Sequence, residues 1–377
     1  MSITPEKRDA GALEAEQAMK SDSETYEISW TREEEAVIRH KLDWQIVPTV
    51  TLLYLLCFLD RITNTKTHIG LLATALARIP EWGTAASPIH TWRNIFFFEG
   101  LLTIACGCLA PLLLPQTPSK SKRLNEREKW IAEERLRLEH KALLNEKVRS
   151  HHVKRAMLNI NNYICAGGFF FINVTVQGIS VFMPTVLVNL GWKAEKAQLY
   201  SVPPYVVASA VAIGISFVSD KTKKRGLYLA LFTLIGITGF AVLRWSSSDN
   251  IKYMGIYFVA IGAFPGGPGF LSWGLNNSAG PAVRAVTGGW IVSLGTMGGI
   301  LAVWAYLSTD GPNFPIGHTI NLVCQVCTLF LALGGIFYCN WENRLRARGG
   351  RDYRLEGKSE EEIADLGYRH PEFRYMA

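Results

Sequence analysis

Charged residues are missing from long stretches of this 377-residue sequence, above all in its C-terminal half. The stretch 159–192 contains no Lys, Arg, Asp or Glu, and five further stretches of similar character follow it. A helix crosses a hydrocarbon core of roughly 30 Å with about 20 mainly apolar residues. We therefore predict an all-α polytopic membrane protein. The predicted C-terminal spans lie within 159–192, 199–219, 227–243, 254–280, 285–308 and 316–340.

The signatures of an enzyme are also lacking. No nucleophile with a base, metal-ligand cluster or phosphate-binding loop stands at a useful spacing. Cys324 and Cys327 have metal-like spacing but no second ligand pair beside them, and all seven cysteines lie in apolar stretches. We predict no enzyme activity, no catalytic residue, no metal and no cofactor.

The net charge of +7 does not form a basic stripe with interleaved aromatics, which argues against a nucleic-acid partner. Lys and Arg instead gather in 120–155, 221–225 and 344–351, with Arg284 between them. Short connections rich in Lys and Arg stay on the cytosolic side of a membrane. The six C-terminal spans are therefore expected to begin and end in the cytosol.

The N-terminus lacks the apolar core of a signal peptide, so we interpret 1–41 as a disordered cytosolic tail. Residues 95–114 form a further apolar stretch that only Glu99 interrupts. Parity then requires one crossing before it, and we expect a single composite helix from Leu42 to about Ile79. This gives eight spans in total and places both termini in the cytosol.

The basic linker 116–156 carries apolar residues at roughly helical spacing, including Leu124, Trp130 and Ile131. We expect a surface helix on the cytosolic membrane face that links two helix bundles. A solvated linker is the alternative.

Six motifs in sequence order resemble the major facilitator superfamily, and within it the fungal anion:cation symporter group typified by allantoate permease. They are 41–44 (KLDW) with 54–61 (YLLCFLDR), 92–100 (WRNIFFFEG), 197–205 (AQLYSVPPY), 272–277 (SWGLNN), 284–285 (RA) and 370–375 (HPEFRY). Members of this family have twelve spans, whereas this sequence passes from Arg61 almost directly to a segment similar to the fifth family helix. The resemblance thus implies a complete C-terminal lobe and an N-terminal lobe that lacks about a hundred residues. The expected organisation is a tail (1–41), a remnant N-terminal lobe (42–115), the linker (116–156), a six-helix lobe (157–342) and a cytosolic tail (343–377).

The resemblance implies proton-coupled symport of a small organic anion, such as a vitamin carboxylate or ureide, by alternating access, with the plasma membrane as location. The expected partners are the organic anion, protons and the lipid bilayer. The alternative is a chain that does not transport: a truncated isoform, a decayed or misannotated product, or a modulator of a full-length relative.

The loop after residue 219 resembles a superfamily signature through Ser216, Asp220, Lys221, Lys224 and Arg225. We assign the last four to gating, since a carboxylate at a helix end can pair with cations across the lobe interface in one state only. Retention of the loop in the cytosol would explain the cations but not Asp220.

Ionisable residues within a membrane span are costly and are functional candidates. Arg61 is our candidate for binding the anion, because a guanidinium binds a carboxylate bidentately. Asp60 or Glu99 is the candidate proton carrier. A structural ion pair between helices is the alternative for all three.

The C-terminal spans must use uncharged polar groups at any cavity. Asn173 and Gln177 are four residues apart on one helical face, and with Trp273 they are candidate substrate contacts. The run 265–269 (PGGPG) must weaken or break its helix, either to free backbone groups for a ligand or as a packing kink.

Overall fold

The structure is a computed structural model that describes residues 30–63, 79–80, 82–84, 87–89, 91–114, 120–121, 124–139, 150–192, 194–359, 362–363 and 366–377. The chain divides into two compact units. Unit 1 comprises residues up to Cys57 and Leu101–His140, and unit 2 comprises Phe58–Gly100 and Lys141–Ala377.

The first helix, α2 (Arg32–Thr63), begins ten residues before the expected start of the first span at Leu42. Thr31 and Glu34 form a capping box: the Glu34 carboxylate accepts from the Thr31 backbone N–H (3.0 Å), and the Thr31 hydroxyl accepts from the Glu34 N–H (3.2 Å). The predicted disordered tail therefore does not reach residue 41. The expected extension of this helix to Ile79 falls largely on residues 64–78, which lie outside the described residues.

The linker forms α5 (Glu126–Glu139) in unit 1. Its Ile131 and Ala132 are buried together with Ile38 of α2, and the Lys41 Nζ to Glu128 Oε1 distance is 2.6 Å. The apolar side of α5 therefore packs on α2. The linker does not continue as one described helix to residue 155, because α6 (Ser150–Met157) starts separately in unit 2 and 140–149 lie outside the description.

A short antiparallel hairpin precedes α4 (Thr91–Leu113), the helix that covers the predicted span 95–114. Strands β1 (Trp82–Thr84) and β2 (Ser87–Ile89) pair with Trp82 opposite Ile89. The Trp82 indole donates to the buried side chain of Asn94 at 2.7 Å, which attaches the hairpin to α4.

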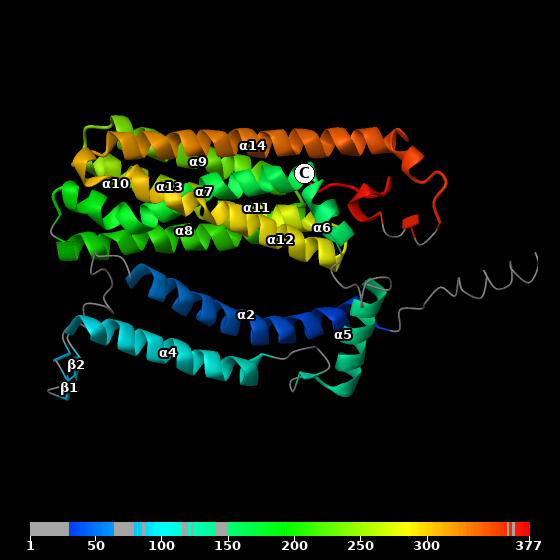
Figure 1. Ribbon diagram of the computed structural model, residues 1–377, viewed down its shortest axis with the longest axis horizontal. Coiled ribbons are helices and arrows are strands. Elements are labelled where there is room, and N and C mark those ends of the chain that lie inside the picture. Colours follow the sequence, from blue (N-terminus) through cyan, green and yellow to red (C-terminus); the bar gives the residue numbers. More distant parts are fainter. Residues whose placement is uncertain are drawn as a thin grey trace, which may run out of the picture. The chain divides into compact units, whose positions relative to one another are not determined.

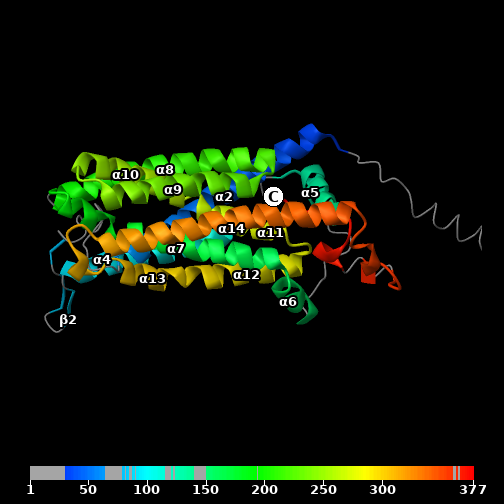
Figure 2. The same ribbon diagram turned by 90° about the horizontal axis from the view of Figure 1, so that it is seen from above.

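Within its described residues, unit 2 contains a bundle with six helical stretches long and apolar enough to cross a membrane, as predicted for the C-terminal half. In Figures 1 and 2, α7 runs through the middle of this bundle. It contacts α8, α10, α11, α12, α13 and α14. The bundle helices are α7 (Ile160–Asn189), α8 (Ala194–Thr222), α9 (Arg225–Trp245), α10 (Asp249–Ala263), α11 (Gly266–Asn276), α12 (Pro281–Thr296), α13 (Gly298–Ala305) and α14 (Pro315–Ala347).

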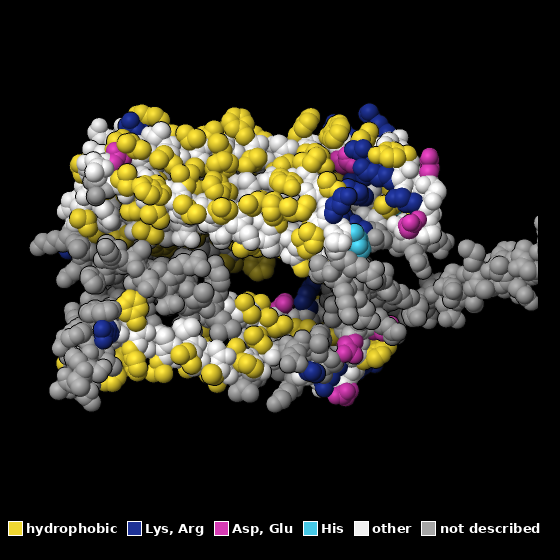
Figure 3. All heavy atoms as spheres, viewed as in Figure 1, with side chains coloured by type: hydrophobic (Ala, Val, Ile, Leu, Met, Phe, Trp, Pro, Cys, Tyr) yellow, Lys and Arg dark blue, Asp and Glu magenta, His cyan; other side chains and the backbone are white. Residues whose placement is uncertain are grey.

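Large apolar side chains cover the outside of this bundle as well as its core (Figure 3). Phe217 on α8 and Phe337 on α14 are each 73% exposed. A surface of this kind is unfavourable in water and is suited to lipid. The total of eight spans stays a prediction.

Two of the six stretches are broken. The α10–α11 break at Phe264 and Pro265 overlaps the start of the predicted 265–269 run, where Pro265 and Pro268 lack the N–H groups that continue a helix. A second break at Met297 separates α12 from α13 and was not predicted.

The C-terminal segment (residues 366–377) folds back onto α14 and the end of α11. Arg346 on α14 donates through Nη1 to the carbonyl oxygens of Tyr368 (2.9 Å) and Phe373 (2.9 Å). Asn343 donates to the Tyr375 carbonyl and accepts from the Tyr375 N–H, both at 2.8 Å. Two 3-10 turns, η3 (Asp352–Arg354) and η4 (Gly367–Arg369), shape the connection, and a third, η2 (Ser308–Asp310), precedes α14.

Candidate functional site

The structure describes the backbone, but not the side chains, of the residues predicted to bind the anion and the proton. Asp60 and Arg61 belong to the last turn of α2, and Glu99 lies in α4, but their side chains are outside the description. Their roles stay predictions from the sequence.

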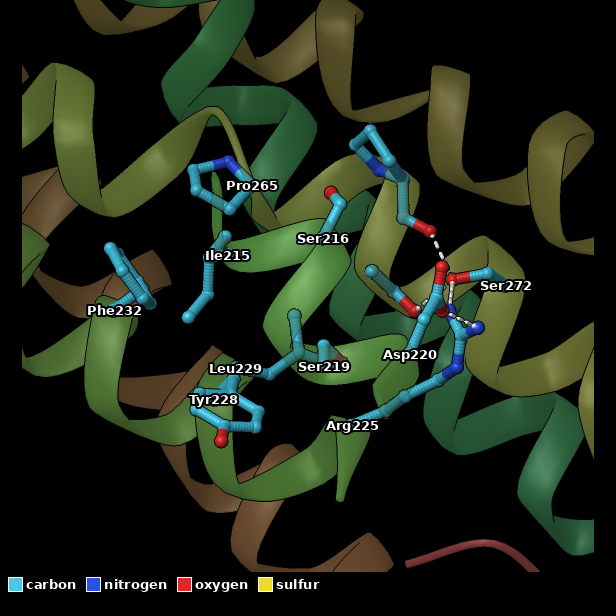
Figure 4. A pocket seen from close by; sticks show the side chains of 12 residues that line it. Ile215, Ser216, Ser219, Asp220, Arg225, Tyr228, Leu229, Phe232, Pro265 and Ser272 are labelled. Carbon is cyan, nitrogen blue, oxygen red and sulfur yellow. Dashed lines mark hydrogen bonds and ion pairs between the residues drawn. The ribbon is translucent and has the colours of Figure 1, made fainter. Parts of the chain in front are cut away.

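The predicted gating loop borders a pocket of about 260 Å³ between α8, α9 and the α10–α11 break (Figure 4). The connection from α8 to α9 has only two residues, and Lys223 turns the chain with a positive φ of 56°. This tight turn brings the end of α8 close to the start of α9. The polar lining comprises Ser216, Ser219, Asp220, Arg225, Tyr228 and Ser272.

Arg225 connects three helices at this pocket. Its guanidinium forms an ion pair with Asp220 at the end of α8 and donates to Ser272 Oγ on α11, as Figure 4 shows. With the Asn276 amide oxygen turned toward Arg225, that oxygen accepts from Nε at 2.8 Å and from Nη2 at 3.1 Å. Ser272 also donates to the Pro268 carbonyl at 2.7 Å.

These contacts change the expectation for Asp220. We expected a partner across the lobe interface, whereas the described partner is Arg225, five residues along the same loop. Lys221 and Lys224 are exposed and have no ion-pair partner among the described residues. Because Arg225 is engaged by Asp220, Ser272 and Asn276, the site is suited to holding helix ends together rather than to binding an anion. The gating assignment of all four residues stays a proposal.

Asn173 and Gln177 both face the α12–α13 break. The Asn173 amide donates to the Gly295 carbonyl at 3.0 Å. A Cβ added at Gly299 would meet Gln177 Cγ at 3.7 Å, so Gln177 lies against the start of α13. The shared face predicted from their spacing is thus present, next to a discontinuous helix. Substrate contact at these side chains stays a prediction.

Trp273 differs from its prediction. Its side chain is completely buried, and its indole N–H donates to the Met376 carbonyl at 2.7 Å. Gly226 and Gly335 provide the space for the ring, since a Cβ at either would lie within 3 Å of it. In this conformation Trp273 is a core residue that also binds the C-terminal segment, and it is not open to a substrate.

Sequence reasoning missed a buried polar group on α14. Gln325 and Asn321 are fully buried, and the Gln325 amide donates to Thr175 Oγ1 on α7 at 3.1 Å. Gln325 Oε1 and Asn321 Oδ1 have no hydrogen-bond partner among the described residues. A buried polar atom without a partner costs about 1–3 kcal/mol, so these amides are further candidates for function. Their spacing of four within an apolar span was the available signal.

Comparisons with known proteins identify the family of this chain. Residues 69–339 match the family model described as Major Facilitator Superfamily. An uncharacterized transporter of Schizosaccharomyces pombe is 27% identical over 298 residues, which cover 78% of this chain and 60% of that protein.

Two other fungal relatives carry more specific names. The MFS-type transporter cnsO of Penicillium expansum is 28% identical over 310 residues, covering 76% of this chain and 58% of the relative. The high-affinity nicotinic acid transporter of Saccharomyces cerevisiae is 25% identical over 308 residues, covering 81% and 56%.

The chain spans roughly 60% or less of the length of these relatives. The family and the relatives' names point to a transporter rather than an enzyme. Together with the six apolar stretches, the family match establishes an integral multi-pass membrane protein. The chain belongs to the major facilitator superfamily.

Proposed function

We propose that this protein is a secondary active transporter that moves a small organic anion together with protons by alternating access. The observation that carries the proposal is the similarity to a relative named for nicotinic acid, which is a carboxylate anion at neutral pH. The two broken helices of unit 2 support it, because transporters of this class use helix breaks to free backbone groups beside the substrate.

Arg61 is the proposed contact for the substrate carboxylate. Asn173 and Gln177 would supply neutral polar contacts from the α7 face beside Gly295 and Gly299. A membrane span tolerates an ionisable side chain where it meets a partner or a water-filled cavity. This requirement fits an Arg that binds an anionic substrate.

Asp60 or Glu99 is the proposed proton carrier. Protonation of such a carboxylate would neutralise its charge before the substrate-loaded transporter switches the side of the membrane to which its cavity opens. We propose that both termini face the cytosol and that the protein resides in the plasma membrane, in keeping with the basic loops at 221–225 and 344–351.

The proposed gate uses Asp220 and Arg225. In this conformation the pair ties the ends of α8, α9 and α11 together. Alternating access requires the two sides of the cavity to open in turn. Release of Arg225 from Ser272 would allow α11 to move about the break at Pro265, while Lys221 and Lys224 remain available to pair with carboxylates elsewhere.

The test is uptake of radiolabelled nicotinate into proteoliposomes under an imposed inward proton gradient. We expect accumulation that Arg61→Ala abolishes and that Arg61→Lys retains in part, because Lys keeps the charge but not the bidentate geometry. Asp60→Asn and Glu99→Gln identify the proton carrier. The variant that loses gradient-driven accumulation but still exchanges substrate across the membrane marks the residue that carries the proton. Correct insertion is checked by protease protection of the C-terminus.

A wider panel of labelled carboxylates and ureides separates a wrong substrate from a wrong function. Accumulation of any of them that depends on the proton gradient supports symport. If a correctly inserted chain accumulates none, the transport proposal fails and the alternative of a non-transporting chain takes its place.

A further inference from the structure

A second pocket, of about 440 Å³, opens where α14 leaves the bundle. One side is formed by the C-terminal segment, including Tyr368 and Tyr375, and another by the start of α7. It extends from the last turns of α14, at Tyr338, Glu342 and Arg346, to residues beyond Ala347, where that span ends. Basic side chains gather at this end of unit 2 in Figure 3. The transport proposal does not use this pocket.

Positive charge dominates the pocket lining. Glu342 is the one acidic residue of its described lining. Five cationic side chains border the pocket: Arg346, Arg351, Arg354, Lys358 and Arg369. Glu342 already pairs with two of these cations, because its carboxylate accepts from Arg346 Nε at 3.0 Å and from Arg351 Nη2 at 2.7 Å. Among the described lining residues, no second carboxylate is present for the remaining three cations.

Of those three cations, Lys358 and Arg369 are exposed and Arg354 is half-buried. The Arg354 guanidinium donates to the Arg369 carbonyl at 3.0 Å, which fixes the two residues next to each other. Lys358 is exposed, and its side chain makes no hydrogen bond or ion pair with the described residues. The pKa of the exposed Tyr353 phenol is lowered by hydrogen bonds from Arg354 and Arg351, so the same arginines favour negative charge at this part of the lining.

Two apolar side chains line the same pocket as the cations. Leu158 and Ile160, at the start of α7, line the same pocket and are 51% and 53% exposed. A ligand with phosphate groups at one end and acyl chains at the other would place the phosphates at the cations and the chains at Leu158 and Ile160. Clusters of Lys and Arg directly beyond a membrane span attract anionic lipid headgroups, at about 1 kcal/mol per residue near the surface.

We propose that this pocket binds a phosphate-bearing anion, with the phosphorylated headgroup of an inositol lipid in the adjacent leaflet as its source. Arg354, Lys358 and Arg369 contact the phosphate groups, while Glu342 holds Arg346 and Arg351 in place behind them. The bound headgroup then connects α14 to the C-terminal segment and stabilises its docked position. A soluble polyphosphate offers the same chemistry without the acyl chains.

Binding is measured by calorimetry on the purified full-length chain in detergent. The probes are short-chain phosphatidylinositol bisphosphate, the same headgroup without acyl chains, inorganic phosphate, and short-chain phosphatidylserine. We expect the bisphosphate lipid to bind more tightly than phosphatidylserine. Equal affinity of the lipid and the free headgroup would assign the site to a soluble polyphosphate, whereas tighter binding of the lipid assigns it to the membrane.

The specificity control is a pair of matched double variants. Lys358→Gln with Arg369→Gln removes two pocket cations, and Arg344→Gln with Arg348→Gln removes two exposed cations from the same helix end outside the pocket lining. We expect the pocket variant to weaken bisphosphate binding about tenfold or more and the control variant to leave it within about twofold. Lys358→Gln alone, expected at about fivefold, replaces the double variant if that variant fails to fold.

The proposal is overturned if no phosphate ligand binds, or if the control variant loses as much affinity as the pocket variant, since nonspecific charge attraction would then explain the binding. Transport activity does not enter the measurement, so the two proposals fail independently.

Discussion

Asn277 at the end of α11 and Met376 near the C-terminus form a reciprocal pair of hydrogen bonds. The Met376 N–H donates to Asn277 Oδ1 at 2.8 Å, and Asn277 Nδ2 donates to the Met376 carbonyl at 3.0 Å. The same carbonyl accepts from the Trp273 indole. A side-chain amide thus substitutes for a strand partner and fixes the last residues of the chain on the bundle. The Asn277 side chain that makes both bonds is fully buried.

The first prediction concerns this pair. Asn277→Ala removes both bonds and leaves the Met376 backbone groups without these partners, so we expect a loss of about 1–3 kcal/mol in the free energy of unfolding. Asn189→Ala is the control, because Asn189 is exposed at the end of α7 and its effect should stay within about 0.5 kcal/mol. Thermal unfolding in detergent measures both. Equal effects would mean that the C-terminal segment is not docked through Asn277.

The second prediction separates Arg225 from Asp220. Asp220 is 62% exposed, whereas the Arg225 side chain is 17% exposed and also bonds Ser272 and Asn276. We therefore expect Asp220→Asn to cost less than about 1 kcal/mol, as exposed ion pairs do. Arg225→Gln should cost about 2–3 kcal/mol, since it leaves several partners unsatisfied. A double-mutant cycle of unfolding free energies tests this order, and an Asp220 effect as large as the Arg225 effect would contradict it.

The third prediction concerns close contact between α9 and α10. A Cβ at Gly262 would lie 2.3 Å from the Gly236 backbone nitrogen, which cannot move aside without shifting α9. Gly262→Ala should therefore destabilise unit 2 by about 1–3 kcal/mol through overpacking. At Gly289 on α12 a Cβ would meet nothing within 4 Å, so Gly289→Ala should be neutral or stabilising by up to about 1 kcal/mol. Comparison of the two melting temperatures checks the prediction; a stable Gly262→Ala protein would refute the close approach.

The fourth prediction is a pH dependence within unit 1. The pKa of Glu128 lies below its ordinary value of 4.5, first because the Lys41 ammonium donates to it and second because the Asn125 backbone N–H does. A lowered carboxyl pKa contributes stability that is complete above pH 4.5 and is lost as the pH falls through the lower, folded value.

Lys41 is 40% exposed, so the contribution is small, about 0.5–1 kcal/mol. Glu128→Gln should release α5 from α2 more readily at pH 7, as measured by amide hydrogen exchange in α5, with little further change below the folded pKa. The control is Glu126→Gln, because Glu126 is 92% exposed beside Lys129. A Glu128→Gln effect that persists unchanged in acid would exclude the ionised pair as its cause.

The spans of unit 2 were predictable because hydrophobic length alone defines them. The break at Pro265 was predictable for a similar local reason, since proline lacks a backbone donor. The break at Met297 was not, because glycines near it indicate only a small helix face. There the Phe170 carbonyl approaches the Gly298 Cβ position to 2.3 Å, and the Asn173 amide bonds the Gly295 carbonyl, so contacts with α7 accompany the bend.

The candidate site shows the same division. The spacing of Asn173 and Gln177 predicted their common face, and Asp220 was identified as a residue in need of a cation. Its described partner could not be predicted, because Arg225, Lys221 and Lys224 are all within reach in sequence. Trp273 was misjudged for a similar reason: an aromatic residue after a helix break can face a cavity or the core, and the glycines that receive it, Gly226 and Gly335, belong to other helices.

The sequence by itself determined the membrane class, the six C-terminal spans and the family resemblance, because each depends on residues that are neighbours along the chain. The tertiary structure decided which polar groups are satisfied, where Trp273 points, and that the C-terminal segment returns to α11 and α14. These outcomes depend on contacts between residues a hundred positions apart. Hydrophobicity places a helix in the membrane but carries no information on which neighbour will meet its polar side chains.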